Sequence, residues 1–226
     1  MYYFKDKEMF NRVKDIEDTA IKTLEPYKEL SRLFHKIQKD DRLYLHSKKV
    51  AELATMIGFA YNLDRKSLIE LSAGAFLHDV GKIELDAAIL YKKGIFTEDE
   101  RSYAQTHASI GKVLLDGTGA TERMIQIAEC HHKKLDGTGY PGPVDIDDIS
   151  LFAQIVTVAD MFEAMTADRC YREAMEEKQV FKILKKDRGI NQLAVRLLEQ
   201  NITTCRAKIY VYGELENIET DTTKMA

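Results

Sequence analysis

Residues 68–82 read LIELSAGAFLHDVGK and decide how the chain is expected to fold. Apolar side chains recur at Leu68, Leu71 and Ala75 with helical spacing, and the same face continues to His78. Asp79 follows directly, at the end of this apolar face. Because an uncompensated buried carboxylate is costly, these two polar residues need partners inside the fold. The stretch therefore predicts a core helix that ends in a polar site.

The same arrangement recurs along the chain. Further titratable residues lie on apolar helical faces or in apolar runs: His46, His107, His131 with its neighbour His132, and Asp160. The helix that carries His107 is expected to begin at a capping box formed by Thr97 and Glu100. An isolated histidine on such a face is most often an ordinary core residue. His35, the remaining histidine, is given no role.

Five histidines and two aspartates in core positions would hinder folding unless they satisfy one another. Neutral imidazoles and carboxylates are good ligands for divalent iron, manganese and zinc, which offers one way to bury them together. Seven candidate ligands exceed the four of a structural zinc site. The set therefore predicts a centre of two metal ions rather than one.

The composition of the 226 residues is that of a globular helical chain, with 45% hydrophobic and 31% charged residues. Only 3 prolines and 12 glycines argue against collagen-like, low-complexity and turn-rich all-β chains. A net charge of −4 lacks the basic bias of a protein that binds duplex nucleic acid. No membrane span and no secretory signal are evident. Widely spaced Cys130, Cys170 and Cys205 suit a reducing cytoplasm, where we expect the protein.

The chain divides into three parts. Residues 1–40 are expected to form a helical lead-in that Pro26 splits into two helices. Residues 41–200 form the domain that carries the titratable residues. Residues 201–226 form a tail in which 205–216, CRAKIYVYGELE, alternates with the period of a strand.

Three motifs resemble the HD-GYP family, a branch of the HD metal-dependent phosphohydrolases. They are HDVGK at 78–82, HHKKLDGTGYP at 131–141 and VADMFEAMTADRCYR at 158–172, and the resemblance covers about residues 42–185. It implies an all-α fold, the HD-domain helical bundle, with a buried two-metal site. It also implies a bacterial phosphodiesterase that hydrolyses cyclic di-GMP to pGpG, with GMP as a further product.

The resemblance assigns a role to each candidate ligand. One ion would be held by His46, His78, Asp79 and Asp160, and the second by His107, His131, His132 and Asp79, which bridges both. The resemblance favours iron, with manganese as the alternative. Two such ions would activate a bridging hydroxide near neutral pH and polarise the phosphoryl oxygens.

Further residues are implied to bind the substrate. Lys82, beside Asp79, would contact a phosphate or donate a proton to the leaving oxygen. Arg169 and Arg172 resemble phosphate-clamping positions of the family. Arg169 follows Asp160 by nine residues, half a turn out of phase on a helix, so the helix is expected to end near Thr166–Asp168. Tyr140 could stack on a guanine.

Several alternatives stay open. Another cyclic dinucleotide, such as the mixed GMP–AMP ring, could be the substrate, and a metal-containing module that signals without catalysis is a different class. The loop Gly139-Tyr140-Pro141 is a candidate contact for a signalling-protein partner, and a homodimer is a further expectation. Some family members use a glutamate four residues before the first histidine to hold a third ion. Arg42 stands there in this chain, and a guanidinium cannot ligate a cation.

Overall fold

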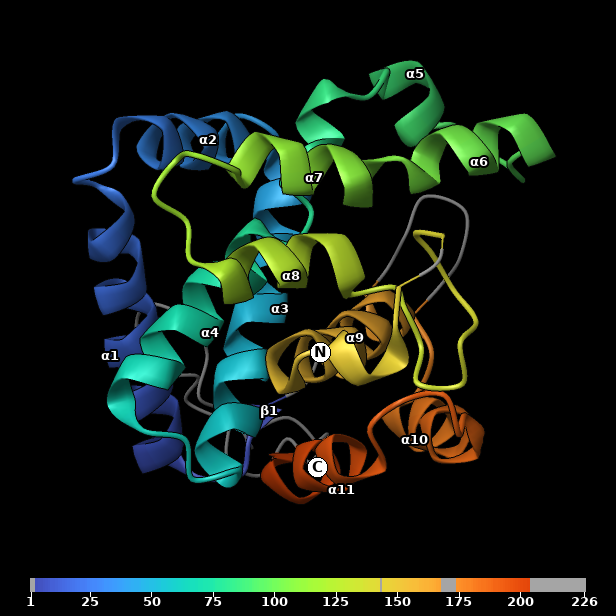
Figure 1. Cartoon of the computed structure of the whole chain (residues 1–226). Coiled ribbons are helices and arrows are strands. Elements are labelled where there is room, and N and C mark those ends of the chain that lie inside the picture. The colour runs from blue at the N-terminus through green and yellow to red at the C-terminus, as the bar shows by residue number, and fades with distance from the viewer. Residues whose placement is uncertain (1–2, 143, 168–173, 204–226) are drawn as a thin grey trace, which may run out of the picture.

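The computed structural model describes residues 3–142, 144–167 and 174–203, which are mostly helical. The predicted all-α class is confirmed (Figure 1). In chain order the elements are β1 (Tyr3–Phe4), α1 (Lys7–Leu24), α2 (Lys28–Gln38), α3 (Asp41–Ala60), α4 (Arg65–Leu77), the 3-10 helix η1 (Val80–Glu84), α5 (Ala87–Leu90), α6 (Glu98–Gln105), α7 (His107–Leu115), α8 (Glu122–Cys130), the 3-10 helix η2 (Ile146–Asp148), α9 (Leu151–Thr166), α10 (Glu177–Lys186), α11 (Gln192–Asn201) and β2 (Ile202–Thr203).

Helix α3 is the centre of the bundle, and α1, α2, α4, α9 and α11 all pack against it. Its N-cap is Asp40, whose carboxylate accepts the main-chain N–H groups of Arg42 and Leu43. Such a cap satisfies donors that have no partner within the helix. Every residue from Val50 to Gly58 is buried, as expected for a helix enclosed on all sides. Helix α3 carries His46 near its N-terminal end.

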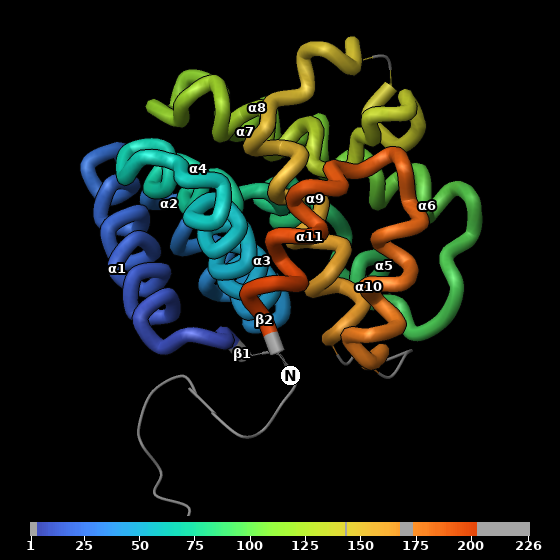
Figure 2. Tube along the Cα trace, turned by 90° about the horizontal axis from the view of Figure 1, so that it is seen from below, coloured from blue at the N-terminus to red at the C-terminus, as the bar shows by residue number. Residues whose placement is uncertain are grey.

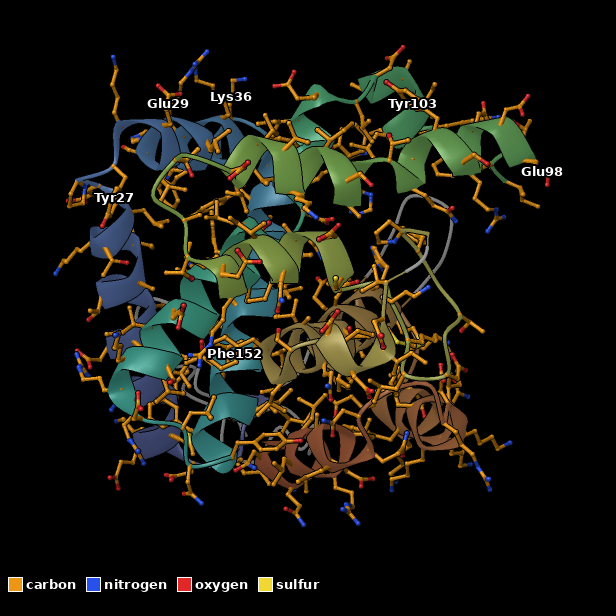
Figure 3. All side chains as sticks on the ribbon, in the orientation of Figure 1. Tyr27, Glu29, Lys36, Glu98, Tyr103 and Phe152 are labelled. Carbon is orange, nitrogen blue, oxygen red and sulfur yellow. The ribbon has the colours of Figure 1, made fainter. Side chains whose placement is uncertain are left out.

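The lead-in helices α1 and α2 pack on one side of the bundle, against α3 and α4 (Figure 2). Helix α1 ends at Leu24 and α2 begins at Lys28, so the break falls at Pro26 as predicted. Figure 3 shows Tyr27 at this bend and Glu29 on the outer side of α2.

The remaining helices complete the bundle around α4 and α9. Helix α8 packs against α4, α7 and α9, while α10 and α11 cover α9 from the opposite side (Figure 1). Leu53 of α3, Leu77 of α4 and Phe162 of α9 are among the largest fully buried side chains. The core therefore forms where the three central helices meet.

One helix differs from the prediction. The capping box of Thr97 and Glu100 is present, but it opens α6, which ends at Gln105 before α7 begins at His107. The hydroxyl and the main-chain N–H of Thr106 both donate to the carbonyl of Tyr103, which tightens the turn and interrupts the helix. The expectation of one continuous helix was therefore wrong.

The end of α9 agrees with the prediction. The helix ends at Thr166, and Ala167 has extended backbone angles, within the interval expected for the break. Arg169 and Arg172 lie outside the described residues, as do Cys170 and Cys205.

The two chain ends meet in a short antiparallel pair, in which Phe4 of β1 lies opposite Ile202 of β2. The strand-like segment 205–216 lies outside the described residues, and the domain boundaries at residues 40 and 200 stay predictions. Among the helices that the structure describes, none has the length and apolar character needed to cross a bilayer.

Candidate metal centre

The site lies where the ends of α4, α7 and α8 approach α3 and α9. The structure brings together all seven residues that the sequence nominates as ligands: His46, His78, Asp79, His107, His131, His132 and Asp160. All seven fall into three overlapping groups, and within each group the candidate ligand atoms lie within 4.8 Å of one another. The groups share members, which is the arrangement expected for adjacent rather than separate ion positions.

Asp79 stands between two sets of histidines. Its Oδ2 atom lies 3.2 Å from Nε2 of His46 and 3.3 Å from Nε2 of His78. Its Oδ1 atom lies 3.2 Å from Nε2 of His107 and 3.7 Å from Nε2 of His131. The two oxygens of one carboxylate thus face two different histidine sets, which is the geometry of a bridging ligand.

Helix ends fix the orientation of three histidine rings. His78 follows the last turn of α4 and its Nδ1 lies 2.7 Å from the carbonyl of Ala75. His107 Nδ1 lies 2.7 Å from the carbonyl of Ala104, in the last turn of α6. His131, which caps α8, similarly approaches carbonyls of that helix's last turn. Carbonyls in a last turn lack helical partners and can only accept, so Nδ1 carries the proton in each ring. The lone pair of Nε2 then points into the site.

Burial keeps several of these rings neutral. Loss of solvation lowers the pKa of His107 to about 3 and holds the pKa of His132 well below its usual range. The same loss of solvation lowers the pKa of His78. Neutral imidazole is the form that ligates a metal.

The two aspartates are ionised in spite of burial. Burial alone would raise the pKa of Asp79, but Lys82 and the surrounding histidines outweigh it and hold that pKa well below the usual range. Burial likewise opposes ionisation of Asp160, and the contact with His46 prevails to give a strongly lowered pKa. For His46, burial is outweighed by hydrogen bonds to carboxylates that raise the pKa of the ring well above its usual value.

The donor set fits a bound cation. Nε2 of His107 and Nε2 of His131 lie 3.4 Å apart, and both face Oδ1 of Asp79. Within the described ranges, Nε2 of His78 and Oδ1 of Asp79 are buried atoms with no hydrogen-bond partner. Buried acceptors that face one another repel, and divalent ions satisfy such a set of nitrogen and carboxylate ligands. The centre is therefore a cluster that could hold divalent metal.

Two further predicted residues border the cluster. Lys82, on η1, donates a hydrogen bond through Nζ to Oδ2 of Asp79. The ring of Tyr140 lies 4.5 Å from that of His132 and 5.9 Å from that of His107, measured between centroids. Their roles in binding substrate stay predictions.

The loop that presents Tyr140 is held close to His132. The N–H of Tyr140 donates to the carbonyl of His132, and Nζ of Lys133 donates to the carbonyl of Gly137. Gly139 has a φ of +85°, and a Cβ atom there would lie 2.0 Å from the carbonyl oxygen of His132. Only glycine allows this approach, so the loop residues predicted as a turn also set the position of the tyrosine.

Sequence reasoning missed two residues of the site. Glu163 lies three residues after Asp160 on α9, and its Oε2 is 2.6 Å from Nδ1 of His46. Thr157 lies on the same helix, and its hydroxyl is 2.8 Å from the carbonyl of His131. The i+3 spacing from Asp160 was the signal that could have identified Glu163.

Comparison with known families identifies one that matches most of the chain. A family model described as the HD domain matches residues 31–192, more than half of the chain. The HD part of the resemblance drawn from the motifs is confirmed by this match.

Curated relatives with similar sequences are phosphodiesterases by name. The chain is 37% identical over 142 residues to 3'3'-cGAMP-specific phosphodiesterase 3 of Vibrio cholerae, which covers 63% of this chain and 31% of that protein. It is 34% identical over 165 residues to the cyclic di-GMP phosphodiesterase response regulator RpfG of Xanthomonas campestris, with 71% and 43% covered. The chain thus spans less than half the length of either relative.

A solved structure has the same fold. The HD domain of the Listeria monocytogenes phosphodiesterase PgpH aligns with a TM-score of 0.58 at 21% identity, covering 74% of this chain and 93% of that one. At this level of identity the structural similarity is evidence for the fold alone.

Proposed function

The chain belongs to the HD domain family, and from this premise we propose that it is a metal-dependent phosphodiesterase that hydrolyses cyclic di-GMP. The product would be pGpG, with GMP formed where cleavage continues. The observation that carries the proposal is the position of Asp79, whose two oxygens face two separate histidine sets. The name of the Xanthomonas relative supports the substrate class.

Two ions would divide the seven ligands as the resemblance implies. His46, His78, Asp79 and Asp160 would hold one, and His107, His131, His132 and Asp79 the other. We propose iron in both positions, with manganese as the alternative, because imidazole and carboxylate ligands suit either. Two cations bound there would activate a water molecule and draw charge from the phosphoryl oxygens.

The protein's own groups would orient and protonate the substrate. Lys82 is fixed by its bond to Asp79 at the edge of the cluster, with about a quarter of its side chain exposed. From there its ammonium group can contact a phosphate and give a proton to the leaving oxygen. The face of Tyr140 would stack against a guanine, and Arg169 and Arg172 would clamp phosphate oxygens.

A second candidate substrate is the mixed GMP–AMP ring, favoured by the 37% identity to the cGAMP-specific Vibrio enzyme. The metal-ligand set would serve either ring, since the scissile phosphodiester is the same chemical group. A metal-containing module that signals without catalysis, through the Gly139-Tyr140-Pro141 loop, is the third candidate. An ordered set of ligands together with Lys82 favours the enzyme over the module.

One experiment separates the three candidates. The protein is purified without chelators or a metal-affinity step, analysed for metal, reconstituted with Fe(II) or Mn(II), and incubated separately with cyclic di-GMP, 3'3'-cGAMP and cyclic di-AMP. Linear products resolved by chromatography are expected first and fastest from cyclic di-GMP. Faster cleavage of the mixed ring would transfer the assignment to that substrate. Loaded metal with no cleavage of any ring would refute the enzyme.

A further inference from the structure

His46 differs from His78, His107 and His131 in the group that its Nδ1 atom contacts. The Nδ1 atoms of His78, His107 and His131 donate to main-chain carbonyls. The Nδ1 atom of His46 instead lies 2.6 Å from Oε2 of Glu163, a side chain that is 4% exposed. In the described part of the chain, this is the one candidate ligand ring whose Nδ1 has a carboxylate as its hydrogen-bond partner.

The position of His46 in its helix explains the difference. His78 and His131 cap helices, and the partner of His107 lies in the last turn of α6, so each finds a carbonyl released at a helix end. His46 lies inside α3, which continues to Ala60, and the carbonyls beside it are used in the helix. Its ring therefore needs a partner from another element. Helix α9 supplies that side chain one turn after Asp160.

We propose that Glu163 is a positioning residue for the metal held by His46, and that it makes this ion the more tightly bound of the two. The carboxylate fixes the proton on Nδ1 and turns Nε2 of His46 toward Asp79 and Asp160, each 3.2 Å away. A carboxylate behind a ligating imidazole makes the ring a stronger donor and orients it. This inference rests on the proposed two-ion centre.

The distribution of charge also favours tighter binding of the ion on the His46 side. Asp79, Asp160 and Glu163 lie around His46, each within 3.2 Å of one of its ring nitrogens. The His107 side has three imidazoles, shares Oδ1 of Asp79, and has Oδ2 of Asp160 only at 3.9 Å from Nδ1 of His132. Lys82 on Asp79 offsets part of this negative charge. Lys49, 3.8 Å from Oε1 of Glu163, lies on the outer side of that carboxylate and is 46% exposed. Because attraction to a cation grows with nearby negative charge, the ion on the His107 side should leave first.

The test measures Mn(II) affinity by competition with a chelator, independently of hydrolysis. Wild-type protein should release its two ions in two separated steps. Glu163→Ala should lower the affinity for the tighter Mn(II) ion about 10–100-fold. Glu163→Gln keeps an oxygen acceptor for Nδ1 of His46 and should retain part of that affinity. Glu177→Gln, a change at a buried glutamate of α10, is the matched control and should leave both steps unchanged.

Single-ion backgrounds locate the effect. In His107→Ala the remaining ion is the one on the His46 side, and adding Glu163→Ala should weaken it by the same factor. In His46→Ala the added Glu163 change should have no further effect, because it acts through that ring. Equal weakening in both backgrounds, or unchanged Mn(II) affinity in Glu163→Gln and Glu163→Ala, would overturn the inference.

The outcome is separable from that of the proposed function. A protein that binds two ions with this dependence on Glu163 but cleaves no cyclic dinucleotide would refute the activity and keep the inference. A protein that cleaves cyclic di-GMP while the Glu163 variants keep wild-type Mn(II) affinity would do the opposite. Should Glu163→Ala fail to fold, Glu163→Gln alone decides, because it preserves size and shape.

Discussion

Replacing Glu52 by glutamine should stabilise the protein at neutral pH. Glu52 is 1% exposed on α3, and Glu17 is 6% exposed on the facing helix α1. Both share the ammonium group of Lys14, which lies 3.0 Å from Glu17 and 3.7 Å from Glu52. Oε1 of Glu52 is a buried atom without a hydrogen-bond partner in the described residues. Two buried carboxyl groups that share their nearest ammonium group are poorly compensated, although Lys48 also attracts both.

The size of the effect follows from the pKa of each group. Burial, with a contribution from Glu17, raises the pKa of Glu52 from 4.5 to about 8. Burial raises the pKa of Glu17 to about 7 against the attraction of Lys14. Keeping one such carboxyl neutral at pH 7, when its pKa is 4.5 in the unfolded chain, costs about 3 kcal/mol. Glutamine is neutral at every pH and avoids that cost.

The sign of the pH dependence is fixed by the raised pKa. Between about pH 4.5 and 8 the folded state binds more protons than the unfolded state, so the free energy of unfolding falls as pH rises. Glu52→Gln removes the proton that Glu52 binds in the folded state, and with it this contribution to the pH dependence. The stabilisation should therefore grow from under about 1 kcal/mol at pH 5 to about 1–3 kcal/mol at pH 7, allowing for the lost attraction to Lys14.

The assay is urea unfolding followed by circular dichroism, at pH 5, 6, 7 and 8 and at one fixed Mn(II) concentration. Comparing variant with wild type at each pH cancels the titration of the histidines in the metal cluster. Glu25→Gln, at an exposed position that follows α1, is the control and should change stability by less than about 0.5 kcal/mol. A variant less stable than wild type at pH 7, or a difference independent of pH, would refute the reasoning.

Four further predictions test the metal centre and the substrate site. Asp79→Ala removes the residue that faces both histidine sets, so metal analysis should show loss of both ions and product assays no hydrolysis; near-normal turnover would contradict the centre. Arg169→Ala should raise the Kd for cyclic di-GMP while Mn(II) affinity holds, and an unchanged Kd would argue against a phosphate clamp. Gly81→Ala should cost several kcal/mol in urea unfolding and lower metal content, because its Cβ would lie 2.0 Å from the carbonyl of His107. Fully loaded protein should contain two ions per chain, since Arg42 cannot ligate a third; a third ion near that residue would overturn this expectation.

Much of the candidate site could be predicted because its residues break a strong pattern. Histidines and aspartates on apolar helical faces stand out against their neighbours, and His78 and Asp160 are found at such positions. The signals that start and end helices are equally local: Pro26 separates α1 from α2, and Thr97 begins α6 through its capping box. Each of these signals lies within a few residues of the structure it determines.

What could not be predicted depends on contacts between distant segments. The hydrogen bond from His46 to Glu163 joins residues 117 positions apart, and the i+3 spacing of Glu163 from Asp160 does not show which ring it contacts. The pairing of Glu17 with Glu52 likewise appears only when α1 packs against α3. The break at Thr106 was missed because the apolar period continues through it, although a threonine can bond back to a carbonyl of the preceding turn.

That break is itself explained by the metal centre. In a continuous helix the carbonyl of Ala104 would accept the N–H group four residues later, and His107 would lie inside the helix as His46 does. Ending α6 at Gln105 places Ala104 in a last turn, where its carbonyl accepts from Nδ1 of His107 and directs Nε2 toward Asp79. In this chain the ligand histidine inside α3 has an acidic partner from α9, whereas the three beside helix ends are oriented by main-chain carbonyls. Two of the three main-chain-oriented rings cap a helix, the third follows the break, and the ring inside α3 contacts Glu163 instead.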